Sequence, residues 1–290
     1  MGRLTRYYAK VCELEDFSDP ELAGLISEID PELSAERPHR KGWEFAMGAL
    51  FLRDVGVLRA DATVLDVGAG TASTLFWLAQ RVGKVVAVDI YGEGEFRHRE
   101  AQCAFADDPA AWAPYEYPRA QLEVQVMDAR RLGFADESFD AVVSFSSIEH
   151  FGTRQEIAHA SREIGRVLKQ GSHAFLVTEG FVRQHPLDRV RLRGSREIRA
   201  LGGRPHRLSL RPSGDVLTRR ELHECVVAPS GLSLVQPLDL SVRGETRRNV
   251  QRLAGAGSAL CPGVRYPHVL LRGRFGSLFT SVCLPLEKRP

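Results

Sequence analysis

The sequence lacks the features that would place the chain in a membrane, in a disulfide-stabilised fold or around a structural zinc. No apolar run approaches the ~18 residues that a transmembrane helix needs. The N-terminal stretch contains no apolar core of a signal peptide. The five cysteines are widely scattered, form no CxxC pair and have no histidine at zinc-finger spacing. We therefore expect a soluble protein of the reducing cytoplasm that binds no metal and no membrane.

A large excess of one charge is also missing. The 39 basic and 37 acidic residues give a formal net charge of +2, which does not by itself indicate a nucleic-acid-binding protein. Residues 183–220 differ, because they carry eleven Arg against three acidic residues, a local excess of +8. Since the whole chain uses 34 Arg and only five Lys, this segment reflects either that general preference or a contact surface for phosphate groups.

The length of 290 residues and the hydrophobic content of 43% are those of a globular protein with one large domain or two smaller ones. Residues 1–60 are predicted to be a mostly helical N-terminal cap, because apolar residues such as Trp43, Met47 and Leu50 recur at three- and four-residue intervals. Residues 61–290 are predicted to form the main domain, with an Arg-rich insertion at about 183–217.

Short apolar runs alternate with helical patterns from residue 62 onward. Strands are predicted at residues 62–67, 84–89, 122–126, 139–144 and 173–178. Between the last two, Thr153 and Glu156 predict a capping box at the start of a helix, and Gly171 predicts its end. Another capped helix is predicted at residues 218–227 and a closing strand at 278–286. This alternation predicts an α/β, doubly wound parallel sheet covered by helices on both faces.

Residues 91–120 interrupt this regular pattern. They contain six aromatic residues among Gly, Pro and acidic residues: Tyr91, Phe96, Phe105, Trp112, Tyr115 and Tyr117. The stretch is too aromatic for a solvated loop and too broken for one helix, so we expect a packed excursion.

A ligand site is predicted where the first strand meets the following helix. Residues 66–70 read DVGAG, and the glycines permit close approach of a ligand to the backbone. Asp89 closes the next strand, at a position where its carboxylate can accept hydrogen bonds from both hydroxyls of an adenosine ribose. Asp128, after the third strand, can accept from an adenine amino group. Dinucleotides and S-adenosylmethionine share this arrangement, and Ser73, where a dinucleotide site wants Gly or Ala, weakens the NAD alternative without excluding it.

The ordered motifs VLDVGAGTA, VVAVDI, VQVMDARRL, FADESFDAVVSFSSIEHF and REIGRVLKQGSHAFLV resemble the motif series of class I S-adenosylmethionine-dependent methyltransferases, over residues 62–178. Ala72 departs from the third glycine of many members, but its side chain is small. The SSIEHFG string and the flanks resemble a branch of uncharacterised bacterial methyltransferases similar to ones associated with glycan or natural-product pathways.

The resemblance implies a cofactor site for S-adenosyl-L-methionine, residue by residue. Asp66, Gly68 and Gly70, with Ala69 between them, border the methionine part; Asp89, followed by Ile90, binds the ribose; Asp128 and Ala129 bracket the adenine; Phe145 or Ser146 lines the cofactor. The family fold implies a Rossmann-like sheet of seven strands, the last antiparallel, with N-terminal helices over the open side of the cofactor. Those helices would bring Trp43 and Glu44 near the site, although an equally good interpretation of Trp43 is a buried core residue that anchors its helix.

The acid–base candidate is His150, because it lies just beyond the fourth strand, where the methyl group is expected to point. Glu149 is expected to orient His150 or to contact the cofactor. Glu179, at the end of the fifth strand, is a candidate substrate contact. The EHFG string also resembles one in cyclopropane fatty-acid synthases, but nothing else in the chain supports that activity.

These observations favour a methyltransferase that O-methylates a small molecule, such as a sugar or a natural product. N-methylation of such a molecule is the next interpretation. Two alternatives stay open: an RNA methyltransferase that uses the Arg-rich segment, and a non-catalytic protein that binds S-adenosylmethionine or a protein partner. The sequence identifies neither the acceptor nor the oligomeric state.

Overall fold

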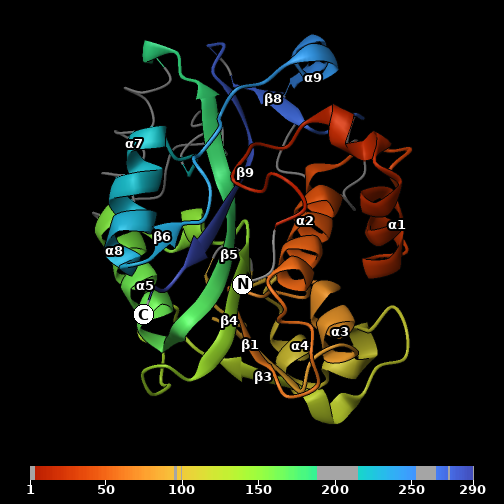
Figure 1. Cartoon of the computed structure of the whole chain (residues 1–290), viewed down its shortest axis with the longest axis vertical. Helices are drawn as coiled ribbons and strands as arrows, with labels where there is room; N and C mark the ends of the chain where they lie inside the picture. The colour runs from red at the N-terminus through yellow and green to blue at the C-terminus, as the bar shows by residue number, and fades with distance from the viewer. Residues whose placement is uncertain are drawn as a thin grey trace.

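The structure, a computed structural model, describes residues 4–94, 97–98, 100–187, 215–252, 266–273 and 275–289. A mixed sheet runs through the molecule with helices on both faces (Figure 1). Its strands follow the order β3-β2-β1-β4-β5-β9-β8-β7, and β6 pairs with β9. Their bounds are β1 Thr63–Val67, β2 Lys84–Asp89, β3 Leu122–Val126, β4 Phe139–Phe145, β5 Leu168–Arg183, β6 Ser233–Leu234, β7 Val250–Arg252, β8 Leu270–Arg272 and β9 Leu278–Glu287.

The first five strands in this order are parallel, and β9 runs antiparallel to β5. The α/β class, the parallel sheet and the antiparallel closing strand are thereby confirmed. The described residues form nine strands where the resemblance implies seven, and three of the nine have only two or three residues. The Arg-rich segment predicted at 183–217 lies largely outside the described residues, which omit 188–214.

The alternation of side chains along the strands divides the core into two layers. Val64 and Ala87 point into a cluster shared with α1 Pro20–Ile29, α2 Arg40–Asp54 and α3 Thr74–Ala79. Leu65 and Val88 point into a second cluster, on the opposite face. Successive residues of a strand face opposite sides, so apolar runs such as TVLDV and KVVAVD bury both faces of a parallel sheet.

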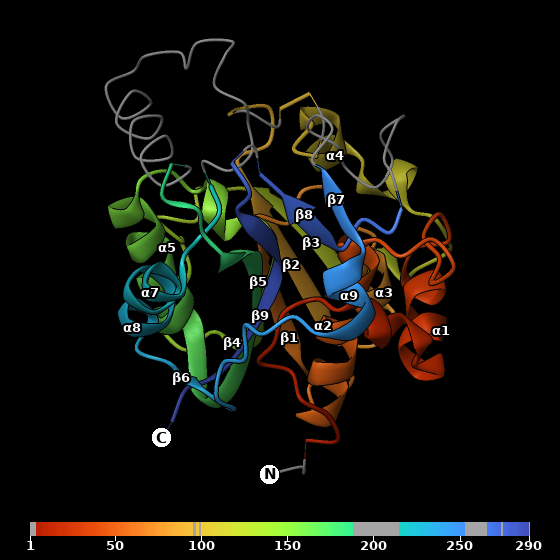
Figure 2. The same ribbon diagram turned by 90° about the horizontal axis from the view of Figure 1, so that it is seen from above.

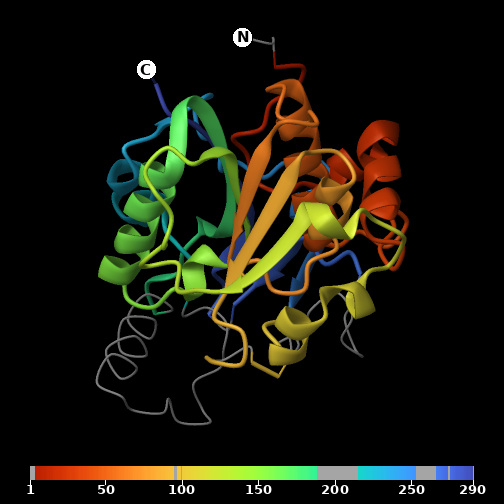
Figure 3. The ribbon, with the colours of Figure 1, turned by 90° about the horizontal axis from the view of Figure 1, so that it is seen from below.

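The second layer is built by α5 Arg154–Val167 and by a continuous helical run of α7 Arg219–Glu221, the π-helical segment η5 Leu222–Val227 and α8 Ala228–Ser230. Figure 2 shows α5, α7 and α8 on one side of the sheet and α1, α2 and α3 on the other. The view from below in Figure 3 shows the sheet between these layers.

The predicted capping box is present, and the predicted capped helix also begins with one. Thr153 pairs with Glu156 at the start of α5, and Thr218 pairs with Glu221 at the start of α7. The predicted helix end at Gly171 is wrong, because the chain turns directly from α5 into β5 at Leu168. The predicted helix at 218–227 extends to Ser230 and contains a π-helical turn.

The described part of the aromatic stretch after β2 folds back onto the first core layer, as predicted, whereas Phe96 lies outside the described residues. It contains α4 Cys103–Asp107 and the 3-10 turns η2 Pro109–Trp112 and η3 Arg119–Gln121. The fully buried ring of Phe105 packs 5.6 Å from that of Tyr91 and 6.3 Å from that of Phe76, measured between centroids.

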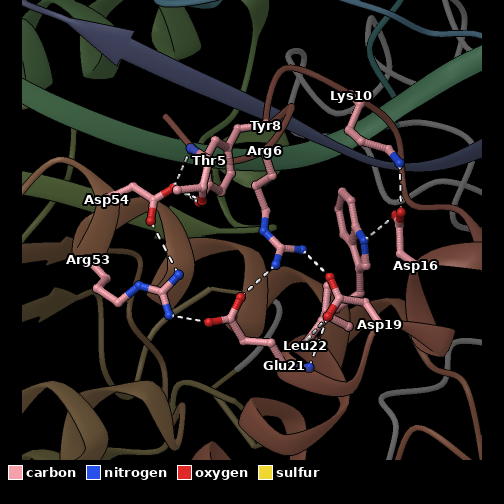
Figure 4. A network of polar contacts seen from close by, with 11 residues as sticks. Thr5, Arg6, Tyr8, Lys10, Asp16, Asp19, Glu21, Leu22, Arg53 and Asp54 are labelled. Carbon is pink, nitrogen blue, oxygen red and sulfur yellow. Dashed lines mark hydrogen bonds and ion pairs between the residues drawn. The ribbon is translucent and has the colours of Figure 1, made fainter. Parts of the chain in front are cut away.

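The N-terminal segment is tied to α1 and α2 by the polar network of Figure 4. Asp54 accepts from the Thr5 hydroxyl at 2.6 Å and from the Tyr8 hydroxyl at 2.7 Å. Arg6 pairs with Asp19 and Glu21 at 2.7 and 2.8 Å. Exposed ion pairs of this kind contribute about 0–1 kcal/mol each, so the burial of the Tyr8 ring contributes more to holding the segment in place.

A short 3-10 turn, η1 Leu14–Ser18, and α9 Gly244–Arg248 complete the upper end of the molecule. Within the part of the chain that the structure describes, none of the helices combines the length and the apolar character that crossing a membrane requires.

Candidate active site

The turn between β1 and α3 needs its glycines for both conformation and space. Gly68 and Gly70 have φ values of +71° and +54°, which L side chains rarely adopt. A Cβ on Gly68 would lie 2.5 Å from the Cβ of Ser147, and a Cβ on Gly70 would lie 2.8 Å from the carbonyl oxygen of Glu100. The amides of Gly68 and Ala69 donate to the Val88 carbonyl at 2.8 and 3.1 Å, which holds the turn against the end of β2.

Asp66, the last but one residue of β1, carries a buried carboxyl with no protein partner. Only 1% of the residue is exposed, and both carboxyl oxygens lack a hydrogen bond among the described residues. Burial raises the pKa of Asp66 to about 8, with a further rise from the negative charge of Asp89 and an opposing effect of Lys41. An orphaned buried carboxyl of this kind is a place for a cationic or hydrogen-bonding group of a ligand.

Asp89 ends β2 beside the same turn, as predicted. One of its oxygens accepts from the Gly70 amide at 2.9 Å and the other from the Ile90 amide at 2.7 Å. Burial raises the pKa of Asp89, although these two hydrogen bonds oppose the rise. Each oxygen keeps a lone pair for a further donor. The side chain of Ile90 next to it is exposed, and the Tyr91 hydroxyl donates to the Gly70 carbonyl at 2.7 Å.

Asp128 follows the neighbouring strand β3 but is already engaged. Both of its oxygens accept from the Arg130 guanidinium at 2.6–2.9 Å, and these bonds lower the pKa of the Asp128 carboxyl. The adjacent Ala129 is buried. The amide of Met127 donates to the Asp89 carbonyl at 2.9 Å, so Asp128 and Asp89 lie at the same edge of the sheet.

The loop after β4 joins the glycine turn to the N-terminal helices. Ser147 donates its hydroxyl proton to the Gly68 carbonyl at 2.6 Å, and Ser146, with a φ of +53°, donates to Glu44 of α2 at 2.8 Å. The ring of Phe145 is buried, and the backbone carbonyl of Phe145 accepts from the Lys41 ammonium at 3.1 Å. Phe145 and Ser146 were predicted from the sequence, whereas Ser147 and Lys41 were not.

Glu149 and His150 lie on the 3-10 turn η4 Ile148–His150, which follows β4. The buried carboxylate of Glu149 accepts from the Thr178 hydroxyl at 2.8 Å and from the Glu179 amide at 3.0 Å. Burial raises the pKa of Glu149 despite the positive charge of His150. Glu149 therefore joins η4 to the end of β5.

His150 keeps 29% of its side chain exposed, and its Nδ1 lies 3.3 Å from a carboxylate oxygen of Asp215. The pKa of His150 is raised to about 9, because the hydrogen bond to Asp215 and the negative charges of Glu149 and Glu179 outweigh burial, which alone would lower it. The imidazole is therefore protonated at neutral pH in this state, and it becomes a base only at higher pH.

The start of α2 contributes a group of charged residues that sequence reasoning named only in part. Glu44 is buried and accepts from Ser146, from Ser281 and from the Lys41 ammonium, the last at 3.1 Å. Burial alone would raise the pKa of Glu44, but the charges of Lys41 and Arg40 lower it. Arg40 forms an ion pair with Glu179 of β5. The basic string HRK before Trp43 was the signal that could have drawn attention to Arg40.

Trp43 has a structural position, one of the two alternatives expected for it. Its ring is fully buried in the first core layer, and its indole nitrogen donates to Asp16 at 2.7 Å. Glu44, the next residue, points instead toward the end of β4 and thus toward the candidate site.

Comparisons with known proteins identify the domain that carries this site. Residues 65–176 match a family model described as a methyltransferase domain. The uncharacterized methyltransferase YcgJ of Bacillus subtilis (strain 168) is 29% identical over 129 residues, which are 44% of this chain and 45% of YcgJ. The "Probable tRNA methyltransferase 9B" of Bos taurus is 41% identical over 54 residues, which are 19% of this chain and 12% of that protein. The matched residues thus span less than half of either relative.

A solved structure shares the fold over almost the whole chain. The crystal structure of geranyl diphosphate C-methyltransferase from Streptomyces coelicolor A3(2) superposes with a TM-score of 0.55, covering 98% of this chain and 90% of that one. The sequence identity is 17%, so the likeness concerns the fold.

Proposed function

We propose that this chain, in which residues 65–176 are a class I methyltransferase domain, transfers the methyl group of S-adenosyl-L-methionine to a small-molecule acceptor. The domain match supports the reaction type, and the Streptomyces enzyme of the same fold is solved with S-adenosyl-L-homocysteine bound. The relatives match only part of the chain, so the activity of the whole chain is part of the proposal.

The observation that carries the proposal is the orphaned carboxyl of Asp66 beside the glycine turn. The cofactor brings a cationic ammonium, and a carboxylate without any other partner is the group that such a cation needs. Asp89 offers a free lone pair on each oxygen to ribose hydroxyls, and the exposed Ile90 offers an apolar contact to the adenine. Ala129, Phe145 and Ser146 are proposed to complete the site. Asp128 would contact the adenine only by sharing its oxygens with Arg130.

When bound, S-adenosylmethionine supplies a methyl group on a sulfonium, which is already activated for in-line displacement. The protein's task is therefore to align the acceptor and to exclude water. Helix α2 helps to form the site. Lys41 and Glu44 hold the loop after β4 in place, and the apolar side of the helix is buried in the first core layer.

For a hydroxyl acceptor the chain must also remove a proton, and we propose His150 for this step. It lies on the loop directly after β4 and keeps part of its ring exposed. Glu149 anchors η4 to β5 through Thr178 and Glu179, and in this proposal it positions the loop that carries His150.

An RNA acceptor is the second candidate. It draws on the local match to a protein named as a tRNA methyltransferase and on the Arg-rich segment 183–220. An RNA enzyme binds RNA with an affinity that falls steeply with salt concentration, whereas a small-molecule enzyme shows little such binding.

The test is ligand-induced thermal stabilisation of the full chain by S-adenosylhomocysteine, with NAD as the competing ligand class. A ligand at a hundredfold excess over its Kd stabilises the folded state by about 2.7 kcal/mol. We expect S-adenosylhomocysteine alone to shift the melting temperature, and Asp89→Ala to abolish the shift. Asp61→Ala is the matched control, because Asp61 is 81% exposed, in the loop before β1. A shift with NAD but not with S-adenosylhomocysteine would overturn the proposal.

A further inference from the structure

We infer that Arg40, His39 and His268 form an anchor for an oxyanion, a carboxylate or phosphate group carried by the methyl acceptor. The inference rests on the proposed function and names the chemical class of its substrate. It is carried by buried nitrogen atoms that have no acceptor, on residues outside the cofactor site.

Two segments far apart in the sequence place these three residues side by side. The Arg40 amide donates to the His268 carbonyl at 3.0 Å, and the His268 amide donates to the Pro38 carbonyl at 2.8 Å. The rings of His39 and His268 stack with their centroids 4.4 Å apart and an angle of 4° between their planes. The two backbones and the two rings therefore support each other as one unit.

Four nitrogen atoms of this unit are buried without a hydrogen-bond partner among the described residues: Nε and Nη1 of Arg40, Nε2 of His39 and Nδ1 of His268. His39 and His268 are only 5% and 8% exposed. The Nδ1 of His39 accepts from the Lys41 amide at 3.0 Å, so the proton of the neutral ring sits on Nε2, and Nε2 is a donor. An unsatisfied buried donor is unfavourable, and proteins rarely keep several together without a ligand or water to accept from them.

The donor types favour an oxyanion. The guanidinium of Arg40 uses only Nη2 in its ion pair with Glu179, and its planar donor set matches carboxylate and phosphate oxygens. His39 adds a neutral donor, because burial and the nearby charges of Arg40 and Lys41 lower its pKa to about 2. A metal cation would be repelled by Arg40.

Three carboxylates act on Arg40: Glu179 is its ion-pair partner, and Glu44 and Glu149 also have other donors. Glu44 forms an ion pair with Lys41 and accepts from two hydroxyls, and Glu149 accepts from the Thr178 hydroxyl and the Glu179 amide. Burial raises the pKa of Glu149, and the charge of His150 opposes this rise. Burial, together with the charge of Arg40, lowers the pKa of His268 to about 4, so the ring is uncharged at neutral pH, and its Nδ1 can donate to an anion when it carries the ring proton.

The anchor lies at the same end of the sheet as the loop that carries His150. Arg40 reaches Glu179, whose amide donates to Glu149, the residue before His150. An acceptor held by its anionic group at Arg40 would thus be directed toward the end of β4, where the methyl group is transferred. The anchor binds a part of the acceptor that does not react and so selects which molecules are aligned.

The experiment compares inorganic phosphate and acetate with chloride, at constant ionic strength, on the full chain saturated with S-adenosylhomocysteine. We expect phosphate, acetate or both to raise the melting temperature above the chloride value, and the stronger anion identifies the natural group. Arg40→Gln is expected to weaken this binding by roughly tenfold or more, a loss of about 1.4 kcal/mol. Arg53→Gln, at the other end of α2 and exposed, is the matched control and is expected to keep it.

A second variant guards against misfolding of Arg40→Gln, which leaves Glu179 without its ion pair. His39→Asn keeps a side chain that can cap α2 but removes the Nε2 donor, and we expect several-fold weaker anion binding. Phosphate and acetate shifts no larger than that of chloride, or equal shifts in wild type and both variants, would show that water satisfies these nitrogens and would overturn the inference. If S-adenosylhomocysteine fails to bind, the proposed function fails separately, and the anion shifts are read on the unloaded chain.

Discussion

The buried carboxyl of Asp66 couples the stability of the protein to pH. The folded chain keeps a proton on Asp66 up to about pH 8, whereas the unfolded chain releases it near the ordinary value of 3.8. The unfolded state therefore binds fewer protons in this window, and the free energy of unfolding falls as the pH rises through it. Cofactor binding would lower the pKa of Asp66 again, because an ammonium beside Asp66 favours the ionised form of its carboxyl.

Asp66→Asn removes this titration while keeping the size of the side chain. We expect the variant to be more stable than wild type at about pH 8.5, by about 1–3 kcal/mol, and to lose this advantage near pH 4. Urea unfolding at several pH values measures the difference. We also expect the variant to bind S-adenosylhomocysteine more weakly, and Asp61→Asn to change neither property. An unchanged pH dependence in Asp66→Asn would contradict the assignment of the buried charge.

His150 changes the stability in the same direction, because its pKa is also raised in the folded state. Its pKa is raised above the ordinary value of 6.5, so its contribution to stability is complete below that value and is lost as the pH rises through about 9. As a base it needs the neutral form, so turnover is expected to increase with pH up to about 9.

We expect His150→Ala to bind S-adenosylhomocysteine as tightly as wild type, to lower kcat by roughly a hundredfold or more and to flatten this rise. Calorimetry of cofactor binding and a pH profile of kcat test the two parts. A variant that turns over at the wild-type rate across the profile would show that His150 only positions the loop through its contact with Asp215.

At the scale of elements, helix α2 determines how the site is closed. It approaches β4 so closely that a Cβ on Gly48 would lie 2.7 and 2.8 Å from two ring carbons of Phe145. The glycine is thus needed for space in the middle of a helix, where it is otherwise unfavourable by about 0.5–1 kcal/mol relative to alanine. From the same helix, Arg40 contacts Glu179 of β5, and Glu44 contacts Ser146 in the loop after β4.

A pair of glycine substitutions separates space from helix propensity. Gly48→Ala is expected to displace Phe145, to destabilise the fold by about 1–3 kcal/mol and to weaken cofactor binding. Gly24→Ala on α1 has no atom within 4 Å of the added Cβ, so we expect it to stabilise the protein by about 0.5–1 kcal/mol. Urea unfolding of both variants gives the comparison, and equal stabilisation by the two substitutions would disprove the close contact between α2 and β4.

At the scale of the whole molecule, the features that could be predicted are those that depend on residues close together in the sequence. The strands at 84–89 and 122–126 have the predicted bounds, and Asp66 and Asp89 meet because parallel strands end at the same edge. The end of α5 was misjudged because Gly171 is a local stop signal, whereas the strand β5 begins earlier, where Leu168 pairs with Phe139 of β4.

The parts that could not be predicted depend on contacts between distant segments. Arg40 meets Glu179, and His39 meets His268, only through the tertiary fold. A periodicity or spacing argument cannot indicate such a meeting, since it reads one element at a time. The capture of Asp128 by Arg130 is local, but the sequence does not say which partner an exposed carboxylate takes.

The N-terminal segment also determines the order in which the chain can assemble. Val11 bridges to Val282 of β9, and the amides of Cys12 and Cys283 donate to the carbonyls of Ser281 and Lys10. Residues 10–12 thus pair with residues 281–283, which lie far away along the chain. Closing so long a loop costs conformational entropy that only a preformed sheet can offset. The N-terminal segment therefore pairs with β9 only after β9 has joined the sheet, and a truncated chain that lacks β9 loses these pairings.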